Sequence, residues 1–567
     1  MRQTEHPNVL LINPRFSLHS FWNYRETCEL VGARHVAPPL GLVTVAALLP
    51  AEWTARLVDC NVEELGEEDL AWADMVMLGG MLSQQRDIRR IMARAQSLGK
   101  PVVVGGPDVT ASPDIYADAE FRVLGEAEDV LGEFVAAWRA GARQGLFAAP
   151  AFPDLTRSPL PRFDLLKLER YMHVGVQFSR GCPFNCEFCN VIELNGRVPR
   201  HKSVDQMITE LEYLYRLGYR GHVDFVDDNL IGNRRAVRGL LPALAEWRIR
   251  RGRPFEFSSE TSLNLADDEE LLTLMRRAGF FAVFVGIESS EPTALLSAKK
   301  TQNANRNISA SVHKFYRAGI FVNAGFIVGF DGEPASVAAG MVTCIEDAAI
   351  PLCMVGLLYA LPGTQLARRL SAEGRLHARF DRPASDRDTD QGTSGLNFTT
   401  LRPRSEVLDD YRRILAAIYE PRAFFGRIRR MVRELDRTQP GYRAPLGAIA
   451  RDLRSFLRIS AQVGVRATGT RFPYWRALAD CLVHNPRAIK TVVSLAALYL
   501  HVRPFSNYLE GMLSSQLESL RMEESSACCA LAAEAGQATP RMGHASASGL
   551  DEREIEVGEA RGLSVTS

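Results

Sequence analysis

The sequence lacks an excess of charge of either sign, since 67 lysine and arginine residues balance 67 aspartate and glutamate residues. No overall field therefore draws the chain toward nucleic acid, and we expect no nucleic-acid partner. The sequence also lacks the run of about 18 apolar residues that a transmembrane helix needs. Its first residues, "MRQTEHPNVLLINP", lack the apolar stretch of a signal peptide, so we expect a cytoplasmic protein.

Cysteine is scarce, with ten residues among 567, and most of these are scattered along the chain or lie near its end. This distribution excludes a disulfide framework. The exception is the stretch "FSRGCPFNCEFCNV" at 178–191, which places Cys182, Cys186 and Cys189 close together. This loop is the first candidate for a chemical site.

A chain of 567 residues exceeds the size of one hydrophobic core, so several domains are expected. In residues 1–145, short apolar runs at 8–12, 55–59, 75–79, 101–106 and 121–125 alternate with helical patterns, which predicts a Rossmann-like parallel sheet. Such sheets bind ligands beyond the carboxyl ends of their strands. The residues at or just after those ends are small or polar: Asn13, Asp59, Asn61, Gly79, Gly80, Ser83, Gly105, Gly106, Gly125 and Glu126.

A proline-rich segment at 146–170 is predicted to be a linker. From 171 to 375 the alternation restarts, with apolar runs at 173–179, 222–228, 254–260, 281–289, 320–330 and 352–363. Six strands with intervening helices predict an open or partial α/β barrel, in which the strand ends carry the chemistry. Ser203-Val204-Asp205-Gln206 fits a capping box that opens the helix after the cysteine loop. Residues 376–522 are predicted to be mostly helical, and 523–567, small and polar, to be a disordered tail.

The cysteine loop follows the first predicted barrel strand. Three thiolates at spacings of four and three suit three irons of a 4Fe-4S cluster and leave the fourth iron without a protein ligand on this loop. Two alternatives are a zinc site with His201 as a distant fourth ligand, or cysteines that are simply buried in the core. Zinc sites usually carry two CxxC elements, and such a pair is absent, so we favour the cluster.

The stretch "CPFNCEFC" resembles the CxxxCxxC loop of the radical S-adenosylmethionine (SAM) superfamily, whose fold is a partial (β/α)6 barrel. "DFVDDN" at 224–229, "SSE" at 258–260, "VGIES" at 285–289 and "GFIVGFDGE" at 325–333 resemble its further motifs, although the usual Gly-Gly-Glu is replaced by Asp-Asp-Asn. The resemblance implies SAM contacts from Phe188, Asp227, Asp228, Asn229, Glu260, Glu288, Ser289, Gly325, Ile327 and Gly329. For each polar strand end alone, a helix cap is the plainer interpretation.

A Rossmann-like block ahead of the barrel resembles the cobalamin-binding subgroup of this superfamily. The resemblance implies that the small and polar strand-end residues of this block, from Asn13 to Glu126, contact cobalamin. "PPLGLVTVAALLP" at 38–50 and "VLGEAEDVL" at 123–131 are similar to stretches that recur there, and the likeness extends over about residues 8–435. The Asp-x-His-x-x-Gly signature is missing at Asp59, so no histidine lower ligand is predicted from that loop. The alternative is a degenerate Rossmann domain that only packs on the barrel.

The resemblance is to the subgroup of hopanoid C-2 methylases and bacteriochlorophyll side-chain methylases. It implies a methyltransferase that uses a 4Fe-4S cluster, SAM and cobalamin, with an electron donor such as flavodoxin or ferredoxin. A 5'-deoxyadenosyl radical would take hydrogen from an unactivated carbon, which would then receive the methyl group of methylcobalamin. A non-methylating reaction such as cyclisation or rearrangement stays open, as does a cobalamin and redox sensor.

Apolar segments at 409–426 and 488–502 lie beside basic residues: Arg427, Arg429, Arg430 and Lys490. We expect them to cover a lipophilic substrate or to touch a membrane surface peripherally. Ordinary core helices are the alternative.

Overall fold

The computed structural model describes residues 5–17, 19–21, 23–377, 395–438, 442 and 446–537 and, within these, only the backbone of 446–449 and 523–537. The described residues up to Ser515 form one compact unit, and those at 516–537 belong to a second. The last helix, α20 (Ile489–Gln537), passes through position 523, where the predicted tail begins. The remainder of that predicted tail, 538–567, lies outside the described residues.

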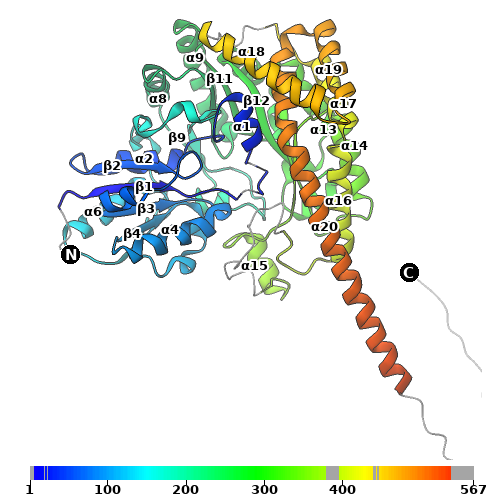
Figure 1. Cartoon of the computed structure of the whole chain (residues 1–567), viewed down its shortest axis with the longest axis horizontal. Helices are drawn as coiled ribbons and strands as arrows, with labels where there is room; N and C mark the ends of the chain where they lie inside the picture. Colours follow the sequence, from blue (N-terminus) through cyan, green and yellow to red (C-terminus); the bar gives the residue numbers. More distant parts are fainter. Residues whose placement is uncertain are drawn as a thin grey trace, which may run out of the picture. The chain divides into compact units, whose positions relative to one another are not determined.

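The first sheet is parallel throughout and is ordered β2-β1-β3-β4-β5-β6, with β1, β3 and β4 in blue in Figure 1. Its strands are β1 (Asn8–Asn13), β2 (Thr54–Asp59), β3 (Met75–Gly79), β4 (Val102–Gly105), β5 (Phe121–Leu124) and β6 (Gly145–Ala148). The first five confirm the predicted strands. The sixth was not predicted and takes its last residues from the expected linker.

Helices cover both faces of this sheet because its strand residues are apolar on both sides. On one face, Leu42 and Phe134 belong to a core with Val9 and Met77, whereas Leu70 and Ile88 belong to the opposite core with Leu10. The helices of this part are α1 (Arg25–Val31), α2 (Leu40–Leu48), α3 (Glu67–Trp72), α4 (Gln85–Ser97), α5 (Pro107–Ala111) and α6 (Ala127–Arg139).

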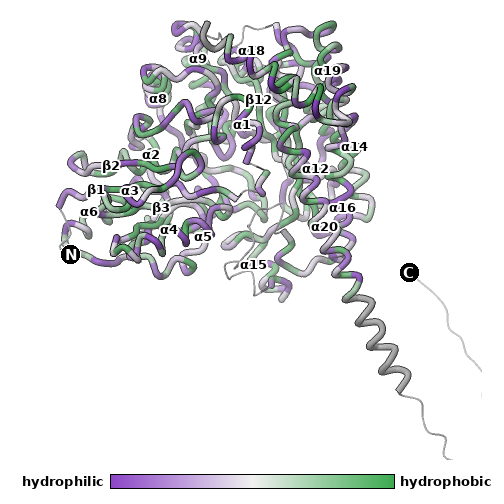
Figure 2. Tube along the Cα trace, in the orientation of Figure 1, coloured by the Kyte–Doolittle hydropathy of each residue, from purple (hydrophilic) through white to green (hydrophobic). Residues whose placement is uncertain are grey.

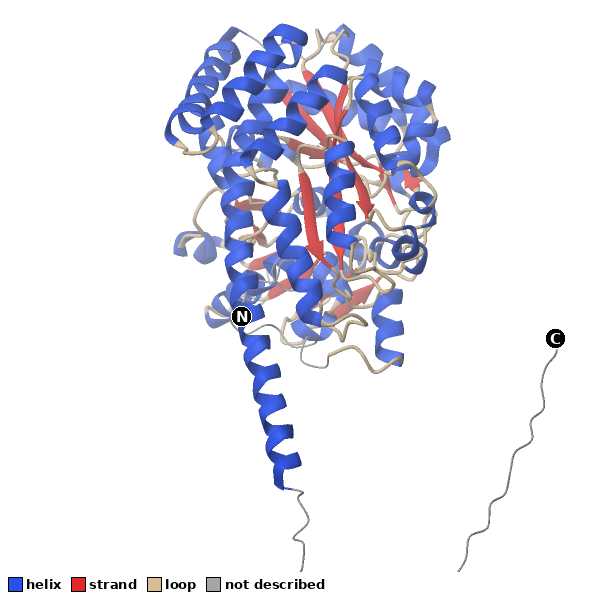
Figure 3. Cartoon of the chain, turned by 90° about the vertical axis from the view of Figure 1, so that its right-hand side faces the viewer, coloured by secondary structure: helices blue, strands red, loops and turns tan. Residues whose placement is uncertain are grey.

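The second sheet is the predicted partial barrel, with six parallel strands ordered β14-β13-β12-β11-β10-β7. The strands are β7 (Val174–Val176), β10 (Gly221–Phe225), β11 (Phe255–Thr261), β12 (Phe280–Glu288), β13 (Phe321–Val328) and β14 (Cys353–Leu357). Figure 3 shows strands in red among surrounding helices. On β11, Phe255 and Phe257 are buried, whereas Ser258 and Glu260 on the other side remain accessible.

The barrel helices are α8 (Val204–Arg216), α9 (Arg234–Arg250), α10 (Glu269–Ala278), α11 (Pro292–Ser297), α12 (Thr301–Ala304), α13 (Ile308–Arg317) and α14 (Val337–Asp347). The capping box predicted at the start of α8 is confirmed. Ser203 Oγ accepts a hydrogen bond from the Gln206 backbone N–H, and Gln206 Oε1 accepts one from the Ser203 N–H. Two short elements near the cysteines, β8 (Ser179–Arg180) and β9 (Arg200–His201), pair antiparallel, and α7 (Val191–Leu194) lies between them.

The C-terminal region is helical, as predicted. It comprises α15 (Gln365–Ala372), α16 (Arg404–Ile418), α17 (Pro421–Glu434), α18 (Leu446–Ala461), α19 (Arg471–His484) and α20, with a π-helical turn η9 (Gln462–Arg466) after α18. No helix of the described residues has the length and apolarity required to cross a bilayer.

The segments expected to face a lipophilic substrate or a membrane are core instead. In 409–426, Tyr411 and Phe424 are fully buried, and in 488–502 Val492 and Leu495 are too. Each segment packs within the helical region, so its apolar side chains face other helices. Burial there stabilises the fold because apolar surface is removed from water.

The basic residues beside these segments are also occupied. Arg427 is fully buried and forms an ion pair with Glu346, which Arg430 also contacts. The remaining two are Arg429 and Lys490, which pair with Asp480 and Glu256 respectively. Each of these four charges therefore has an intramolecular partner, and the membrane contact expected of them stays a prediction.

Candidate active site

The cysteine loop begins after β7 and β8, at the carboxyl end of the barrel. Two predicted site residues fix the backbone that leads into it. Asp227 accepts a hydrogen bond from the Phe178 N–H at 3.0 Å and further bonds from Ser179, and Asp228 accepts one from the Gly181 N–H at 2.7 Å. These carboxylates hold the loop itself. Burial raises the pKa of Asp227 to about 7 against the opposing effect of these bonds.

The three cysteines are free thiols, and amide donors point at two of them. Asn229 Nδ2 lies 3.9 Å from Cys182 Sγ, and Gln302 Nε2 lies 3.7 Å from Cys186 Sγ. Burial raises the pKa of each thiol, that of Cys189 to about 12. Donors aimed at sulfur favour thiolates, so this set fits the ligands of an iron-sulfur cluster.

Lys300 supplies the positive charge of this site, and the sequence analysis missed it. Its buried ammonium lies 2.5 Å from Glu288 Oε1. The positive charge opposes the rise in pKa that burial causes at the Cys186 and Cys189 thiols. Glu288 adopts φ 70°, a conformation that a glutamate rarely takes. No motif could have identified Lys300, because one lysine after a short helix has no distinguishing pattern.

Two of the remaining predicted SAM residues are Phe188, in the cysteine loop, and Glu260, on β11. Phe188 packs edge-on against Phe330, with ring centroids 5.5 Å apart. The Glu260 side chain stays accessible. Desolvation by the surrounding protein and the charges of nearby aspartates both raise its pKa. The others lie on or just after β12 and β13: Gly325 and Ile327 within β13, Ser289, which is fully buried, after β12, and Gly329, whose N–H donates to Glu333 Oε2, after β13.

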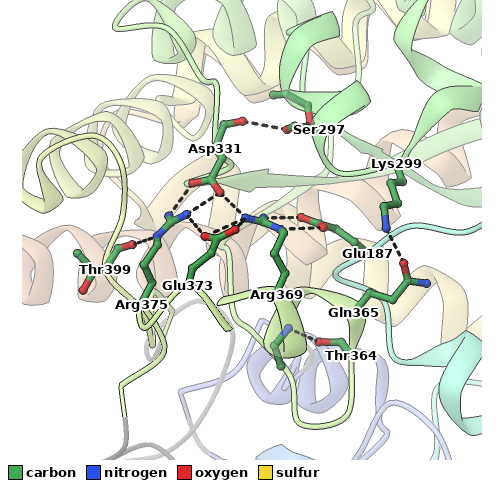
Figure 4. A network of polar contacts seen from close by, with 12 residues as sticks. Glu187, Ser297, Lys299, Asp331, Thr364, Gln365, Arg369, Glu373, Arg375 and Thr399 are labelled. Atoms are coloured by element: carbon green, nitrogen blue, oxygen red, sulfur yellow. Dashed lines mark hydrogen bonds and ion pairs between the residues drawn. The ribbon is translucent and has the colours of Figure 1, made fainter. Parts of the chain in front are cut away.

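A network of ion pairs holds the cysteine loop from the C-terminal side (Figure 4). Glu187, between Cys186 and Cys189, accepts two hydrogen bonds from Arg369 of α15, at 2.7 and 3.1 Å. Arg369 also donates a hydrogen bond to Asp331. Asp331 Oδ1 accepts another from Arg375 Nη2 at 2.7 Å. Asp331 follows β13, so the network joins the loop, the barrel and α15 in one fixed arrangement.

At the edge of the first sheet, the predicted polar side chains bond to one another or to the barrel. Asn13 Oδ1 accepts a hydrogen bond from Gln84 Nε2 at 3.1 Å. Asp59 accepts two from Asn61 and one from the Tyr171 hydroxyl at 2.9 Å. These side chains therefore have protein partners already.

The glycines of the same edge keep side chains away from the ends of the strands. Gly79, Gly80, Gly105 and Gly106 are partly accessible, and Gly125 is exposed with nothing within 4 Å of an added Cβ. Gly106 adopts φ 91° and packs backbone to backbone on Gly80, which only glycine allows. Ser83, in a short turn after β3, is also partly accessible. An edge with few side chains fits cobalamin, which needs close approach to the backbone.

Glu126, the last of the predicted cobalamin residues, joins the end of β5 to the short antiparallel pair β8-β9. Its carboxylate pairs with Arg180 at 2.6 Å and with Arg200 at 2.5 Å, and Glu128 pairs with Arg180 at 2.9 Å. Arg180 stands two positions before Cys182. The acidic stretch after β5 thus holds β8, the short strand between β7 and the cysteine loop.

A zinc site with His201 has no support in this geometry. His201 Nδ1 lies 2.9 Å from the Lys202 carbonyl oxygen, and its ring stacks on Phe178. Within the part of the chain that the structure describes, no group of three or more His, Cys, Asp or Glu side chains surrounds one ion. In a cubane cluster each thiolate binds a different iron, so the three sulfurs need not converge on one point.

Comparison with protein families assigns the same three regions. Residues 30–135 match the B12 binding domain, and residues 176–339 match the radical SAM superfamily. Residues 364–512, from α15 onward, match a domain of unknown function, DUF4070.

Two relatives match almost end to end. "Uncharacterized methyltransferase sll1242" of Synechocystis is 39% identical, over 90% of this chain and 94% of the relative. "Hopanoid C-2 methylase" of Rhodopseudomonas palustris is 34% identical, over 91% of this chain and 97% of the relative. The fold is that of the cobalamin-dependent radical enzyme OxsB, with a TM-score of 0.58, 14% identity, and coverage of 92% of this chain and 80% of the other.

The chain belongs to the cobalamin-binding radical SAM family of methyltransferases. It is therefore an enzyme, with a 4Fe-4S cluster, SAM and cobalamin as its cofactors. The degenerate-domain and sensor alternatives are set aside, because the family retains both a cofactor domain and a catalytic barrel.

Proposed function

We propose that the chain methylates an sp3 carbon of a membrane-associated lipid or tetrapyrrole. Its 34% identity to the hopanoid C-2 methylase, across nearly the full length of both chains, carries this proposal. A lower identity of 25%, over 75% of the relative, links it to "Bacteriochlorophyllide d C-12(1)-methyltransferase" of Chlorobaculum tepidum. Both names denote methylation of a polycyclic molecule.

In this proposal Cys182, Cys186 and Cys189 hold the cluster. Lys300, paired with Glu288, acts electrostatically on the thiols, and its ammonium would balance thiolate or carboxylate charge. Asp227 and Asp228 fix the loop, and Phe188 provides an apolar surface beside it. When bound, the cluster and SAM supply radical chemistry and cobalamin supplies the methyl group.

The remaining predicted SAM residues come from β11, β12 and β13 or the residues just after them, and we assign them to the same ligand. The glycine edge of the first sheet is assigned to the corrin ring. The assigned domains are 1–145 for cobalamin, 171–375 for the barrel and 376–522 for the helical region. A flavodoxin or ferredoxin is the proposed electron donor. The expected location of the protein is the cytoplasm.

The cluster assignment predicts complete loss of SAM cleavage in Cys186→Ala, since an iron without its thiolate leaves the cluster unstable. The measurement is 5'-deoxyadenosine formed by anaerobically reconstituted protein with SAM and reductant, together with iron content. Cys344→Ala is the matched control, because Cys344 lies on α14 outside the loop. Full cleavage by the Cys186 variant, or iron loss in the Cys344 variant, would contradict the ligand set.

The substrate class is tested by deleting the gene and comparing lipid and pigment extracts by mass spectrometry. We expect one compound to lose a single methylene unit and to regain it on complementation. S-adenosylhomocysteine formed in vitro distinguishes methylation from cyclisation or rearrangement. Unchanged lipids and pigments, with a methyl group missing from a water-soluble product, would refute the lipophilic substrate.

A further inference from the structure

Helix α19 is apolar on two sides, although only one of them is covered. Tyr474, Ala477, Leu478 and Cys481 are buried on its inner side. The opposite side exposes large hydrophobic side chains at helical spacing, which places them in one stripe. They are Phe472 (73% exposed), Trp475 (44%), Leu482 (52%) and Val483 (77%).

The elements just before α19 extend this pattern. Leu453 and Leu457, four positions apart on α18, are both more than half exposed, as is Val465 in η9. Seven of the nineteen exposed large hydrophobic side chains in the described residues therefore lie between Leu453 and Val483. Such a concentration marks an interaction surface and not scattered surface residues. We call these seven side chains the α18–α19 surface.

Arginines surround this surface. Residues 446–487 contain two acidic residues, Asp452 and Asp480, and the latter already pairs with Arg433. Figure 2 shows hydrophobic and hydrophilic residues interleaved along α18 and α19. The segment carries seven exposed arginines, and in the described structure none of them forms an ion pair: Arg451, Arg454, Arg458, Arg466, Arg471, Arg476 and Arg487.

We propose that the α18–α19 surface docks the protein on an anionic lipid bilayer. An exposed stripe of Phe, Trp, Leu and Val on a helix, bordered by arginines, is the pattern of helices that lie in the membrane interface. Tryptophan prefers that interface, and each arginine near an anionic surface adds attraction. A second copy of the chain is a poor occupant, because a symmetric contact would bring arginines against arginines.

This surface differs from the segments named from the sequence. Residues 409–426 and 488–502 carry buried apolar side chains, and α17 packs on α19, so the membrane contact moves to helices whose apolar residues stay outside. The proposal does not depend on the substrate, since docking would occur with or without it. It would, however, place the enzyme where a lipid substrate is found.

The test is sedimentation of the full-length protein with vesicles of phosphatidylcholine alone or mixed with phosphatidylglycerol. We expect binding to the anionic vesicles that weakens with added salt. Phe472→Ser/Val483→Ser should bind at least about tenfold more weakly, because two exposed apolar side chains no longer enter the interface. Arg454→Gln/Arg458→Gln should reduce binding to the anionic vesicles and leave binding to the phosphatidylcholine vesicles unchanged.

The control is Leu98→Ser/Ile249→Ser, which removes two hydrophobic side chains that are more than half exposed, one just after α4 and one on α9. It should bind like the unchanged protein, and cleavage of SAM should be equal in all variants, which shows that they fold. Equal vesicle binding by Phe472→Ser/Val483→Ser would overturn the proposal. The proposal would also be overturned if the unchanged protein bound no vesicles but formed a dimer that this variant dissociates.

Discussion

The two parallel sheets end their strands in similar polar residues but use them differently. In the first sheet, Asp59 and Glu126 bond to Tyr171 and Arg180, which belong to or border the barrel. In the barrel, Asp227 holds the cysteine loop, whereas Glu333 has one carboxylate oxygen without a hydrogen-bond partner among the described residues. Polar strand ends in a Rossmann-like sheet can thus serve domain contact as well as ligand binding.

The sharpest way to break this comparison is Arg180→Met. The substitution leaves the carboxylates of Glu126 and Glu128, which are 7% and 4% exposed, without their shared partner. Removing one member of such a buried group costs about 3 kcal/mol or more. We expect the free energy of unfolding, measured by urea denaturation, to fall by about that amount.

The control is Arg157→Met, whose guanidinium is 73% exposed and pairs with Asp129. An exposed pair contributes about 1 kcal/mol at most. Equal losses in the two variants would mean that the contact between the sheets is no stronger than a surface ion pair.

The barrel side is tested through pH with Glu333→Gln. Burial raises the pKa of Glu333 to about 7, against the opposing effects of the Gly329 N–H and Arg402. The native state therefore holds a proton that the unfolded chain releases near pH 4.5, and stability falls as pH rises from there to about 7. Between pH 5 and 8 the variant should gain up to about 3 kcal/mol relative to the unchanged protein.

The measurement is the denaturation midpoint across that pH range, with Glu270→Gln as the control because Glu270 is 76% exposed. The control should follow the unchanged protein at every pH. A Glu333 variant with the same pH slope as the unchanged protein would show that this carboxylate is ionised in the native state.

The smallest effect is expected from Tyr171→Phe. The change removes the hydroxyl that donates to Asp59, a carboxylate only 1% exposed, while the aromatic ring stays in place. We expect a loss of about 2 kcal/mol in unfolding free energy. Tyr213→Phe, which removes an exposed bond to Asp164, should lose less. Equal losses would make the Asp59 contact unimportant to the join between the sheets.

The sequence predicted the elements that depend on local pattern. Eleven apolar runs became strands, Ser203 and Gln206 formed the expected capping box, and the cysteine loop followed the first barrel strand. Contacts between distant residues were missed, as with Lys300 beside the thiols or Arg369 on Glu187, because spacing in the chain does not encode them. Apolar helices posed a further problem: a buried segment such as 488–502 and an exposed one such as α19 look alike in composition.

The grip on the cysteine loop has a consequence for how this enzyme can change over generations. Arg180, just before the loop, is held by Glu126, and Glu187, within it, is held by Arg369. A gene fusion that replaced either flanking region with that of a distant relative would carry away one half of an ion pair and leave the other buried. The three regions are therefore expected to be inherited together, and a successful exchange would have to bring the matching charges across both junctions.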